Sequence, residues 1–293
     1  MALGENKLGR MIDSRTTAYG LFGFPIAHSL SPHIHNYLFQ KCNLNAIYLC
    51  FQVHPLSLKK ALEGAISLGL RGLNVTIPHK EKIIPYLAGI DREAKIIGAV
   101  NTVKIEKGRI WGFNTDGEGF ILSLKKHGFS PKGKSVFILG AGGAGKAVSV
   151  YLAKEQVACL VVYDCIYSRA QKLVTTIKTF FPKVKSAKAI KEKKDINMHS
   201  IDLLINATGL GLNVKDSLPR VLCNYQKGLV VYDLIYNPPL PRLLREAKKH
   251  NLRVINGLWM LIYQALHSEC IWWQQDFSSH ADQIYKILSN KLK

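Results

Sequence analysis

Acidic residues are scarce in this chain of 293 residues, which holds 20 Asp and Glu against 40 Lys and Arg and carries a formal net charge of +20. Long apolar runs are also missing, because the longest, residues 258–266, contains Gln264 and is far shorter than the about 20 residues that span a bilayer. The first twenty residues lack the apolar core of a secretory signal and contain Glu5 and Asp13. We therefore expect a short disordered tail before a first strand, and no membrane partner.

Cysteine motifs typical of metal or redox sites are absent as well. The six cysteines, at positions 42, 50, 159, 165, 223 and 270, form no CxxC motif and no His/Cys cluster at metal-ligand spacing. His28, His33 and His35 are spaced like metal ligands, but no acidic residue accompanies them in the sequence. We expect reduced core cysteines, a cytoplasmic protein and no metal site.

The positive charge raises the possibility of nucleic-acid binding. Many basic residues are spread along presumed helix faces. The one dense run, residues 183–194, is expected to be a lysine-rich loop and lacks interleaved aromatic residues. A solvated surface that helps to attract small anions explains this pattern better, so no nucleic-acid partner is expected. The hydrophobic fraction of 47% predicts a globular fold, and the length favours two domains.

Short apolar runs of β-type alternate with helical patterns along the chain, which predicts an α/β fold. Ser31 and Pro32 are expected to form the N-cap and first turn of a helix. Pro78 is expected to open another helical turn, which places Lys80 near a helix start just beyond a strand end. Ligands bind at such strand ends in open α/β sheets. The polar break at residues 130–133 suggests a domain border. The predicted strands cover residues 18–24, 45–53 and 72–77, a hairpin covers 99–113, and helices cover 31–40 and 56–68.

A glycine-rich turn lies between a predicted strand and a helix at residues 135–154. Gly140, Gly142 and Gly145 fit the pattern GxGxxG, and a second strand ends at Asp164, 24 positions after Gly140. This context predicts a Rossmann-type dinucleotide site, in which the glycines allow a tight turn and the helix N-terminus faces the pyrophosphate.

Asp164 bears on the choice of cofactor. A carboxylate at this position accepts hydrogen bonds from a free ribose and repels a 2′-phosphate, so it favours NAD. An alternative is that Asp164 merely begins a turn, and Arg169 or Lys172 could still reach a phosphate from the next helix.

A nicotinamide cofactor implies hydride transfer, usually to or from a carbonyl carbon, and the developing alkoxide requires a proton donor. Lys80 is a candidate, with Asp116 as the carboxylate that holds it and raises its pKa. The spacing of these two residues does not show by itself that they meet.

Eight motifs occur in an order that closely resembles the shikimate dehydrogenase family, including its quinate/shikimate branch. The resemblance extends from about Tyr19 to Ala265. The motifs are HSLSPHIHN (28–36), NVTIPHK (74–80), GAVNTV (98–103), GFNTDG (112–117), GAGGAG (140–145), INATGLG (205–211), YDLIYNP (232–238) and GLWMLIYQA (257–265).

The resemblance implies roles for individual residues. Lys80 would be the catalytic acid/base and Asp116 its partner. The other substrate-binding residues would be Ser29, Ser31, Asn74, Thr76, Asn101, Thr115, Tyr236 and Gln264. The cofactor-binding residues would be Gly140, Ala141, Gly142, Gly143, Ala144, Asp164, Thr208, Gly209, Leu210, Leu234, Gly257 and Met260.

The family fold implies a discontinuous substrate-binding domain, 1–117 plus 258–293, and a Rossmann NAD(P)-binding domain, 118–257, with a cleft between them. The implied reaction is reversible hydride transfer between NAD(P)H and 3-dehydroshikimate, giving shikimate, in chorismate and aromatic amino acid biosynthesis. The protein would be a monomer or a homodimer.

One departure from the family concerns the cofactor. Biosynthetic members carry an Asn-Arg-Thr stretch where this chain has Asp164, Cys165 and Ile166, so the arginine that clamps a 2′-phosphate is missing. We therefore expect NAD to be favoured, with NADP also possible. The alternatives are an NAD-dependent dehydrogenase acting mainly on quinate and, from another class, a non-catalytic basic protein that binds nucleotides or nucleic acid.

Overall fold

The computed structural model describes residues 12–212, 222 and 224–292, so the N-terminal tail expected at residues 1–11 and Cys223 lie outside the described residues. The chain forms two compact units. The first contains the described residues up to Ala94 together with 99–115 and 265–288, and the second contains 95–98, 116–264 and the described residues from Ser289 onward.

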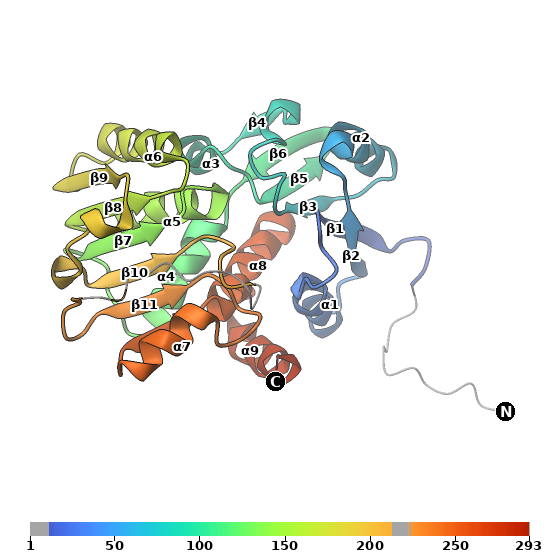
Figure 1. Ribbon diagram of the computed structural model, residues 1–293. Helices are drawn as coiled ribbons and strands as arrows, with labels where there is room; N and C mark the ends of the chain where they lie inside the picture. Colours follow the sequence, from blue (N-terminus) through green and yellow to red (C-terminus); the bar gives the residue numbers. More distant parts are fainter. Residues whose placement is uncertain (1–11, 213–221, 223, 293) are drawn as a thin grey trace. The chain divides into compact units, whose positions relative to one another are not determined.

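The first unit is built on a mixed six-stranded sheet with the order β2-β1-β3-β5-β6-β4 (Figure 1). Strand β1 runs parallel to β2 and β3, whereas β5 runs antiparallel to both β3 and β6. The predicted hairpin is therefore confirmed as β5 and β6. The strands are β1 (Thr17–Gly23), β2 (Ala46–Gln52), β3 (Gly72–Val75), β4 (Gly89–Ile90), β5 (Thr102–Glu106) and β6 (Arg109–Phe113).

Helices cover this first sheet. In Figure 1, α1 (Ser31–Lys41) and α2 (Leu58–Ser67) lie on opposite sides of β1. Leu73 and Val103, on neighbouring strands, are fully buried in the core beneath α2. The C-terminal part of α8 (Leu258–Trp273) also belongs to this unit, where the Trp272 ring packs on Tyr19 with 4.9 Å between ring centroids.

The second unit holds a six-stranded parallel sheet with the order β12-β11-β10-β7-β8-β9. Counted from its first strand, this order is 3-2-1-4-5-6, the doubly wound arrangement of a Rossmann fold. The predicted α/β fold class is therefore confirmed. The strands are β7 (Ser135–Leu139), β8 (Cys159–Tyr163), β9 (Ser186–Ile190), β10 (Leu203–Asn206), β11 (Val230–Asp233) and β12 (Arg253–Asn256).

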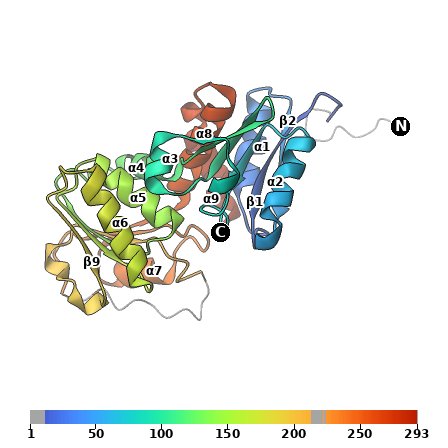
Figure 2. The same ribbon diagram turned by 90° about the horizontal axis from the view of Figure 1, so that it is seen from above.

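Helices α4, α5 and α6 lie together in Figure 2, and α7 lies apart from them against β11 and β12. The helices of this part are α4 (Asp116–Lys126), α5 (Gly143–Lys154), α6 (Tyr167–Phe180) and α7 (Arg242–Lys249). The remaining elements are α3 (Arg92–Ile97), α9 (Ala281–Lys291) and short 3₁₀ turns at Pro55–Ser57, Ile84–Tyr86, Lys193–Asp195, Met198–Ser200 and Ser278–His280.

Three local expectations are wrong. The expected helical turn at Pro78 is a series of turns instead, because the Lys80 carbonyl accepts the N–H of Val100 (2.8 Å) rather than that of a residue one helical turn later. Ser31 is not the N-cap of α1, which is Leu30. The lysine-rich run, expected to be a loop, contains β9, because Ala187 and Ile190 point into the core while the lysine between them is exposed. The compact units change at residues 115–116, and the domain border suggested at 130–133 stays a prediction.

Candidate active site

A network of buried polar side chains joins two strands and one helix of the first unit. The carboxamide nitrogen of Asn74, at the end of β3, lies 3.0 Å from Ser268 Oγ on α8 and 3.2 Å from Thr102 Oγ1 on β5. Ser268 Oγ and Thr102 Oγ1 are in turn 2.8 Å apart. Buried polar groups without partners are costly, so this set of mutual hydrogen bonds fixes the side chains in place.

Asn101 extends the network to the residue that precedes α4. Its carboxamide nitrogen donates to Thr115 Oγ1 (2.9 Å), and its oxygen accepts the backbone N–H of Thr115 (2.8 Å). This reciprocal pair holds residues 101 and 115 side by side. The structure therefore brings together three residues predicted from the sequence, namely Asn74, Asn101 and Thr115.

The two predicted serines lie at the start of α1. The backbone N–H of Ser31 donates to Ser29 Oγ (3.2 Å), so Ser29 supplies a side-chain bond at this helix start. The side chain of Ser29 lies close to Cys50, and that of Ser31 lies close to Tyr48. Because residues 48 and 50 lie on one face of β2, this strand holds both serines.

Lys80 is half-buried in the turn that follows β3. The neighbouring His79 anchors this turn, because its ring is fully buried and its Nε2–H donates to the carbonyl oxygen of Val53 (2.8 Å). Burial lowers the pKa of His79, so the ring is neutral at neutral pH and adds no positive charge beside Lys80. Thr76 begins the same turn, where its carbonyl oxygen accepts the backbone N–H of His79 (2.8 Å).

Three predicted substrate residues belong to the second unit. Asp116 is buried as the first residue of α4, where the helix dipole favours a carboxylate. Gln264 lies on α8 one turn before Ser268, and its side-chain N–H donates to the Leu261 carbonyl (2.8 Å). Tyr236 is half-buried after β11. Since Lys80 lies in the first unit, its pairing with Asp116 stays a prediction.

The glycine-rich turn joins β7 to α5 in the manner that dinucleotide binding requires. Gly140 has a φ of 102°, a conformation that favours glycine. A Cβ on Gly145 would lie 2.1 Å from the carbonyl oxygen of Gly140, whereas a Cβ on Gly142 would meet no atom within 4 Å. Gly145 is thus needed for helix–strand packing, while the backbone at Gly142 borders open space that a ligand can occupy.

The start of α5 is suited to an anion. The helix has 12 residues, its N-cap Gly142 makes no side-chain hydrogen bond, and its first turn holds no acidic residue. Backbone N–H groups of the first turn, at Gly143 and Ala144, therefore face a position where a phosphate group is favoured.

Asp164 is bound to the same turn. Its Oδ2 accepts the backbone N–H of Ala141 (2.7 Å), and its Oδ1 accepts that of Ile166 (2.8 Å). The side chain is only 8% exposed. The Cys165 thiol also donates to Oδ1 (3.6 Å). Asp164 therefore does begin a turn, and its Oδ2 retains a lone pair that can accept a further hydrogen bond.

A second loop of the cofactor unit, after β10, is held by Asn206. Its Oδ1 accepts the hydroxyl and the backbone N–H of Thr208 (2.6 and 3.1 Å), and its nitrogen donates to the Leu210 carbonyl (3.0 Å). That nitrogen also lies 3.1 Å from Oδ1 of Asp233. Burial raises the pKa of Asp233 to about 6, and its Oδ2 has no partner among the described residues. Gly209 and Leu210 are exposed at the tip of the loop.

Gly257 and Leu234 are in close backbone contact. A Cβ on Gly257 would lie 2.0 Å from the carbonyl oxygen of Leu234, so only glycine fits there. Met260, one turn into α8, is 7% exposed. Gly257 and Leu234 thus pack closely where β11 and β12 end. The approach of Leu234, Gly257 and Met260 to a cofactor stays a prediction.

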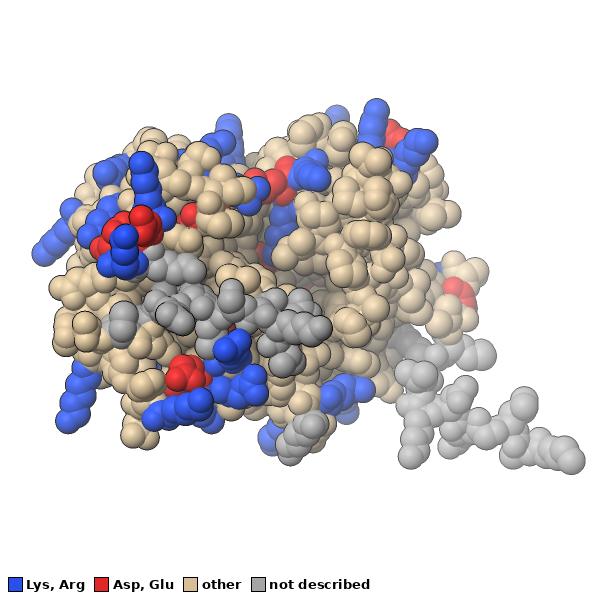
Figure 3. All heavy atoms as spheres, viewed as in Figure 1, with Lys and Arg blue, Asp and Glu red and all other residues tan. Residues whose placement is uncertain are grey.

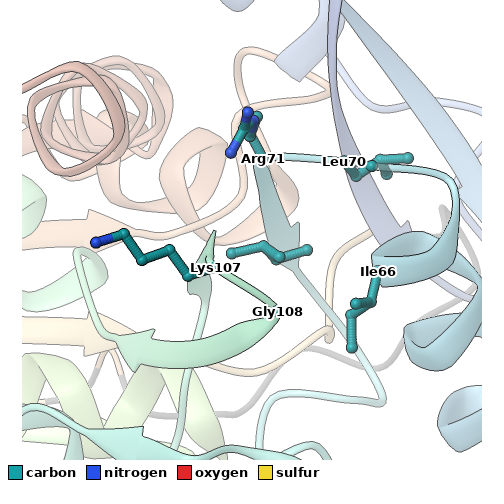
Figure 4. Close-up of a pocket in the computed structure, with 7 residues that line it drawn as sticks. Ile66, Leu70, Arg71, Lys107 and Gly108 are labelled. Carbon is teal, nitrogen blue, oxygen red and sulfur yellow. The ribbon is translucent and has the colours of Figure 1, made fainter.

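A surface pocket of about 250 Å³ lies elsewhere on the first unit, and it contains none of the predicted site residues. Figure 4 shows that the Arg71 and Lys107 side chains at this pocket extend in different directions. The pocket is lined by Ile66, Gly69, Leu70, Arg71, Ile105, Lys107 and Gly108.

The positive charge is distributed rather than concentrated. On the face seen in Figure 3, Lys and Arg side chains form several separate groups with Asp and Glu among them. No helix in the described part of the chain is both long enough and apolar enough to cross a membrane.

Comparison with known proteins identifies the family. Residues 21–103 match the family model described as the shikimate dehydrogenase substrate binding domain. The shikimate dehydrogenase (NADP(+)) of Methanopyrus kandleri is 41% identical over 265 residues, which cover 89% of this chain and 91% of that protein. The chain belongs to the shikimate dehydrogenase family. This membership favours an oxidoreductase over the non-catalytic alternative.

Solved structures agree with this assignment. A crystal structure of a shikimate dehydrogenase in complex with NADP+ has a TM-score of 0.88 at 37% identity and covers 98% of this chain and 100% of its own. Shikimate 5-dehydrogenase from Listeria monocytogenes, in complex with shikimate and NAD, has a TM-score of 0.86 at 32% identity and covers 97% and 100%. Members of this family in complex with either cofactor therefore share the fold.

Sequence reasoning missed several residues of the site. Tyr48 and Cys50 alternate along β2 with Ile47, Leu49 and Phe51, but the strand pattern alone does not show what they contact. Ser268 follows Gln264 by one helical turn, a spacing that could have suggested a shared helix face. Glu269, on the other hand, forms a buried pair with His35 that no local pattern predicts. No acidic residue accompanies His35 in the local sequence, because its carboxylate partner lies 234 positions away.

Proposed function

We propose that this protein catalyses the reversible interconversion of 3-dehydroshikimate and shikimate by hydride transfer with a nicotinamide cofactor. The observation that carries the proposal is the buried network of Asn74, Asn101 and Thr115, which presents uncharged polar groups suited to a ring bearing several hydroxyls. Its relatives named shikimate dehydrogenase, which match the chain over most of its length, support this substrate.

Residue roles follow from this proposal. Ser29 and Ser31, tied to each other and to β2, would hydrogen-bond the substrate carboxylate. Asn74, Thr76, Asn101, Thr115, Tyr236 and Gln264 would contact the ring hydroxyls. The first unit would thus bind substrate and the second the cofactor, with the predicted boundaries of 1–117 plus 258–293 and 118–257.

Lys80 would provide the proton. When bound, the nicotinamide supplies or accepts the hydride. In reduction the carbonyl π bond breaks as a C–H bond forms, and protonated Lys80 donates to the oxygen so that the product carries an O–H bond. In oxidation neutral Lys80 accepts the same proton. Asp116 would hold the ammonium group and stabilise its charged form.

The cofactor would be held mainly by backbone. The N–H groups at the start of α5, next to Gly142, would bind the pyrophosphate, and residues 208–210 would border the nicotinamide. We propose that NAD is preferred and NADP is also used. The Asp164 carboxylate, fixed by the Ala141 N–H at the turn, supports this preference, because its charge would repel a 2′-phosphate.

A four-way steady-state assay tests the function. Initial rates are measured with shikimate or quinate as substrate and NAD+ or NADP+ as oxidant. The proposal predicts the highest kcat/KM for shikimate with NAD+. A higher value for quinate would identify the quinate-directed alternative, and no turnover of either acid would overturn the proposed function. The cytoplasmic location and the choice between monomer and homodimer stay predictions.

A further inference from the structure

Tyr48 connects two of the residues proposed to bind substrate. Its ring is buried, with 1% exposure, and its hydroxyl donates to the Asn74 carboxamide oxygen (2.8 Å). The Ser31 side chain also lies close to Tyr48. One phenol therefore touches both the residue proposed to bind the substrate carboxylate and a residue proposed to bind its ring.

The orientation of the Asn74 carboxamide follows from its partners. The backbone carbonyl of Asn101 lies 3.2 Å from the Asn74 nitrogen and can only accept a hydrogen bond. The nitrogen must therefore face residue 101, and the oxygen must face Tyr48. Since the two N–H groups have three acceptors within 3.2 Å, the group left for a ligand is the second lone pair of the oxygen.

A buried pair supports the Tyr48 ring from behind. The imidazole of His35 on α1 stacks on this ring, with 4.1 Å between centroids and 12° between planes. Its Nδ1 hydrogen-bonds to the carboxylate of Glu269 on α8, and both side chains have no exposed surface. Neighbouring residues of α8 thus support both side chains. Ser268 hydrogen-bonds to Asn74, and Glu269 holds the His35 ring that stacks on Tyr48.

Stability alone gives little reason for such a pair. His35 Nε2 has no partner among the described residues, and an unpaired buried polar atom costs roughly 1–3 kcal/mol. Burial also raises the pKa of the Glu269 carboxyl. Apolar side chains of similar volume often replace buried ionic pairs without loss of stability. The pair instead gives the Tyr48 ring one defined position.

We propose that Glu269, His35 and Tyr48 are positioning residues that fix the Asn74 carboxamide so that its oxygen accepts a hydrogen bond from a substrate hydroxyl. This inference rests on the proposed function of Asn74 as a substrate-binding residue. It assigns a role in substrate affinity to a helix residue that touches neither substrate nor cofactor.

The first experiment removes one hydroxyl group. Tyr48→Phe is expected to raise KM for shikimate about tenfold, with kcat changed less than about threefold, because a ground-state contact is weakened. KM for the cofactor serves as the internal control and should stay at the wild-type value. An unchanged KM for shikimate, or an equal rise in KM for the cofactor, would overturn the proposal.

A double-mutant cycle tests whether Tyr48 acts through Asn74. In an Asn74→Ala background, Tyr48→Phe should raise KM by no more than about threefold, the remainder acting through Ser31. If Asn74→Ala is too slow to assay, shikimate dissociation constants from calorimetry with bound cofactor replace KM. A tenfold rise in KM caused by Tyr48→Phe in both backgrounds would show that Tyr48 does not act through Asn74.

Glu269 offers a matched pair of variants. Glu269→Gln keeps an oxygen that accepts the His35 N–H, so its KM for shikimate should stay within about threefold of wild type, while Glu269→Leu should raise it about tenfold. Equal values in the two variants would contradict the positioning role. Wild-type enzyme without turnover or binding of shikimate would overturn the proposed function itself, whereas active enzyme with additive effects would overturn only this inference.

Discussion

The two units recognise ligands by different means. In the first, the candidate site consists of side chains from α1, β2, β3, β5 and α8, bonded to one another in the network around Asn74. In the second, it consists mostly of backbone at the turn from Gly140 to Gly145, where side chains are nearly absent. In the first unit, a substitution should impair ligand binding or catalysis by removing a side-chain functional group. In the second unit, it should do so by adding side-chain atoms where the backbone must pack closely or approach a ligand.

The largest expected effect is in the first unit. Lys80→Ala should lower kcat by about 10²- to 10⁴-fold, the usual contribution of a positioned acid or base. Steady-state kinetics measure it, with the exposed neighbour Lys82→Ala as a matched control that should retain wild-type kcat. Near-normal turnover of Lys80→Ala would remove this residue from the mechanism.

In the second unit, adding one methyl group at Gly145 should strongly destabilise the fold. Gly145→Ala would place a Cβ 2.1 Å from a backbone carbonyl that cannot easily move, so the free energy of unfolding should fall by about 3 kcal/mol. Urea denaturation measures this loss.

Gly142→Ala is the matched control for Gly145→Ala. Its added methyl group would enter open space, so the fold should keep its stability. A cofactor KM raised about tenfold is expected, because the methyl group occupies the space where the pyrophosphate would approach. Equal losses of stability in both variants would contradict the distinction between packing and ligand approach at this turn.

A buried carboxylate gives the second unit a pH dependence. The pKa of Asp233 is raised from 3.8 to about 6 by burial, so the folded state binds a proton that the unfolded state releases above pH 4. Stability from this group is present below about pH 4 and is lost as the pH rises to about 6, by roughly 3 kcal/mol.

Asp233→Asn tests this dependence, since its oxygen can still accept the bonds from Asn206 and Ile235. The variant should be more stable than wild type at pH 7 by about 3 kcal/mol, with the difference vanishing near pH 4. Denaturation curves at both pH values measure it. A constant difference across this range would show that Asp233 has an ordinary pKa.

The smallest effect concerns cofactor choice. Asp164→Asn combined with Cys165→Arg removes a negative charge and adds a guanidinium group, so the ratio of kcat/KM for NADP to that for NAD should rise about tenfold. Cys165→Ser is the control and should leave the ratio unchanged. An unchanged ratio in the double variant would show that the end of β8 does not contact the adenosine ribose.

Local sequence patterns predicted the features that depend on neighbours in the chain. The glycine-rich turn and the hairpin of β5 and β6 are continuous segments whose backbone bonds are short-range. The turn at Lys80 was not predictable in this way, because its carbonyl is bonded by Val100, 20 positions later. The pair of His35 and Glu269 joins residues 234 positions apart, so only the packing of α8 against α1 reveals it.

The lysine-rich run also has a consequence for self-association. Strand β9 is the outermost strand of its sheet, and one of its backbone edges is unpaired within that sheet. Lys188 is exposed in the middle of this strand, between Ala187 and Ala189. Like charges on two such edges repel each other, which hinders a second copy from adding its own strand. We therefore expect Lys188 to hinder edge-to-edge aggregation of the concentrated protein.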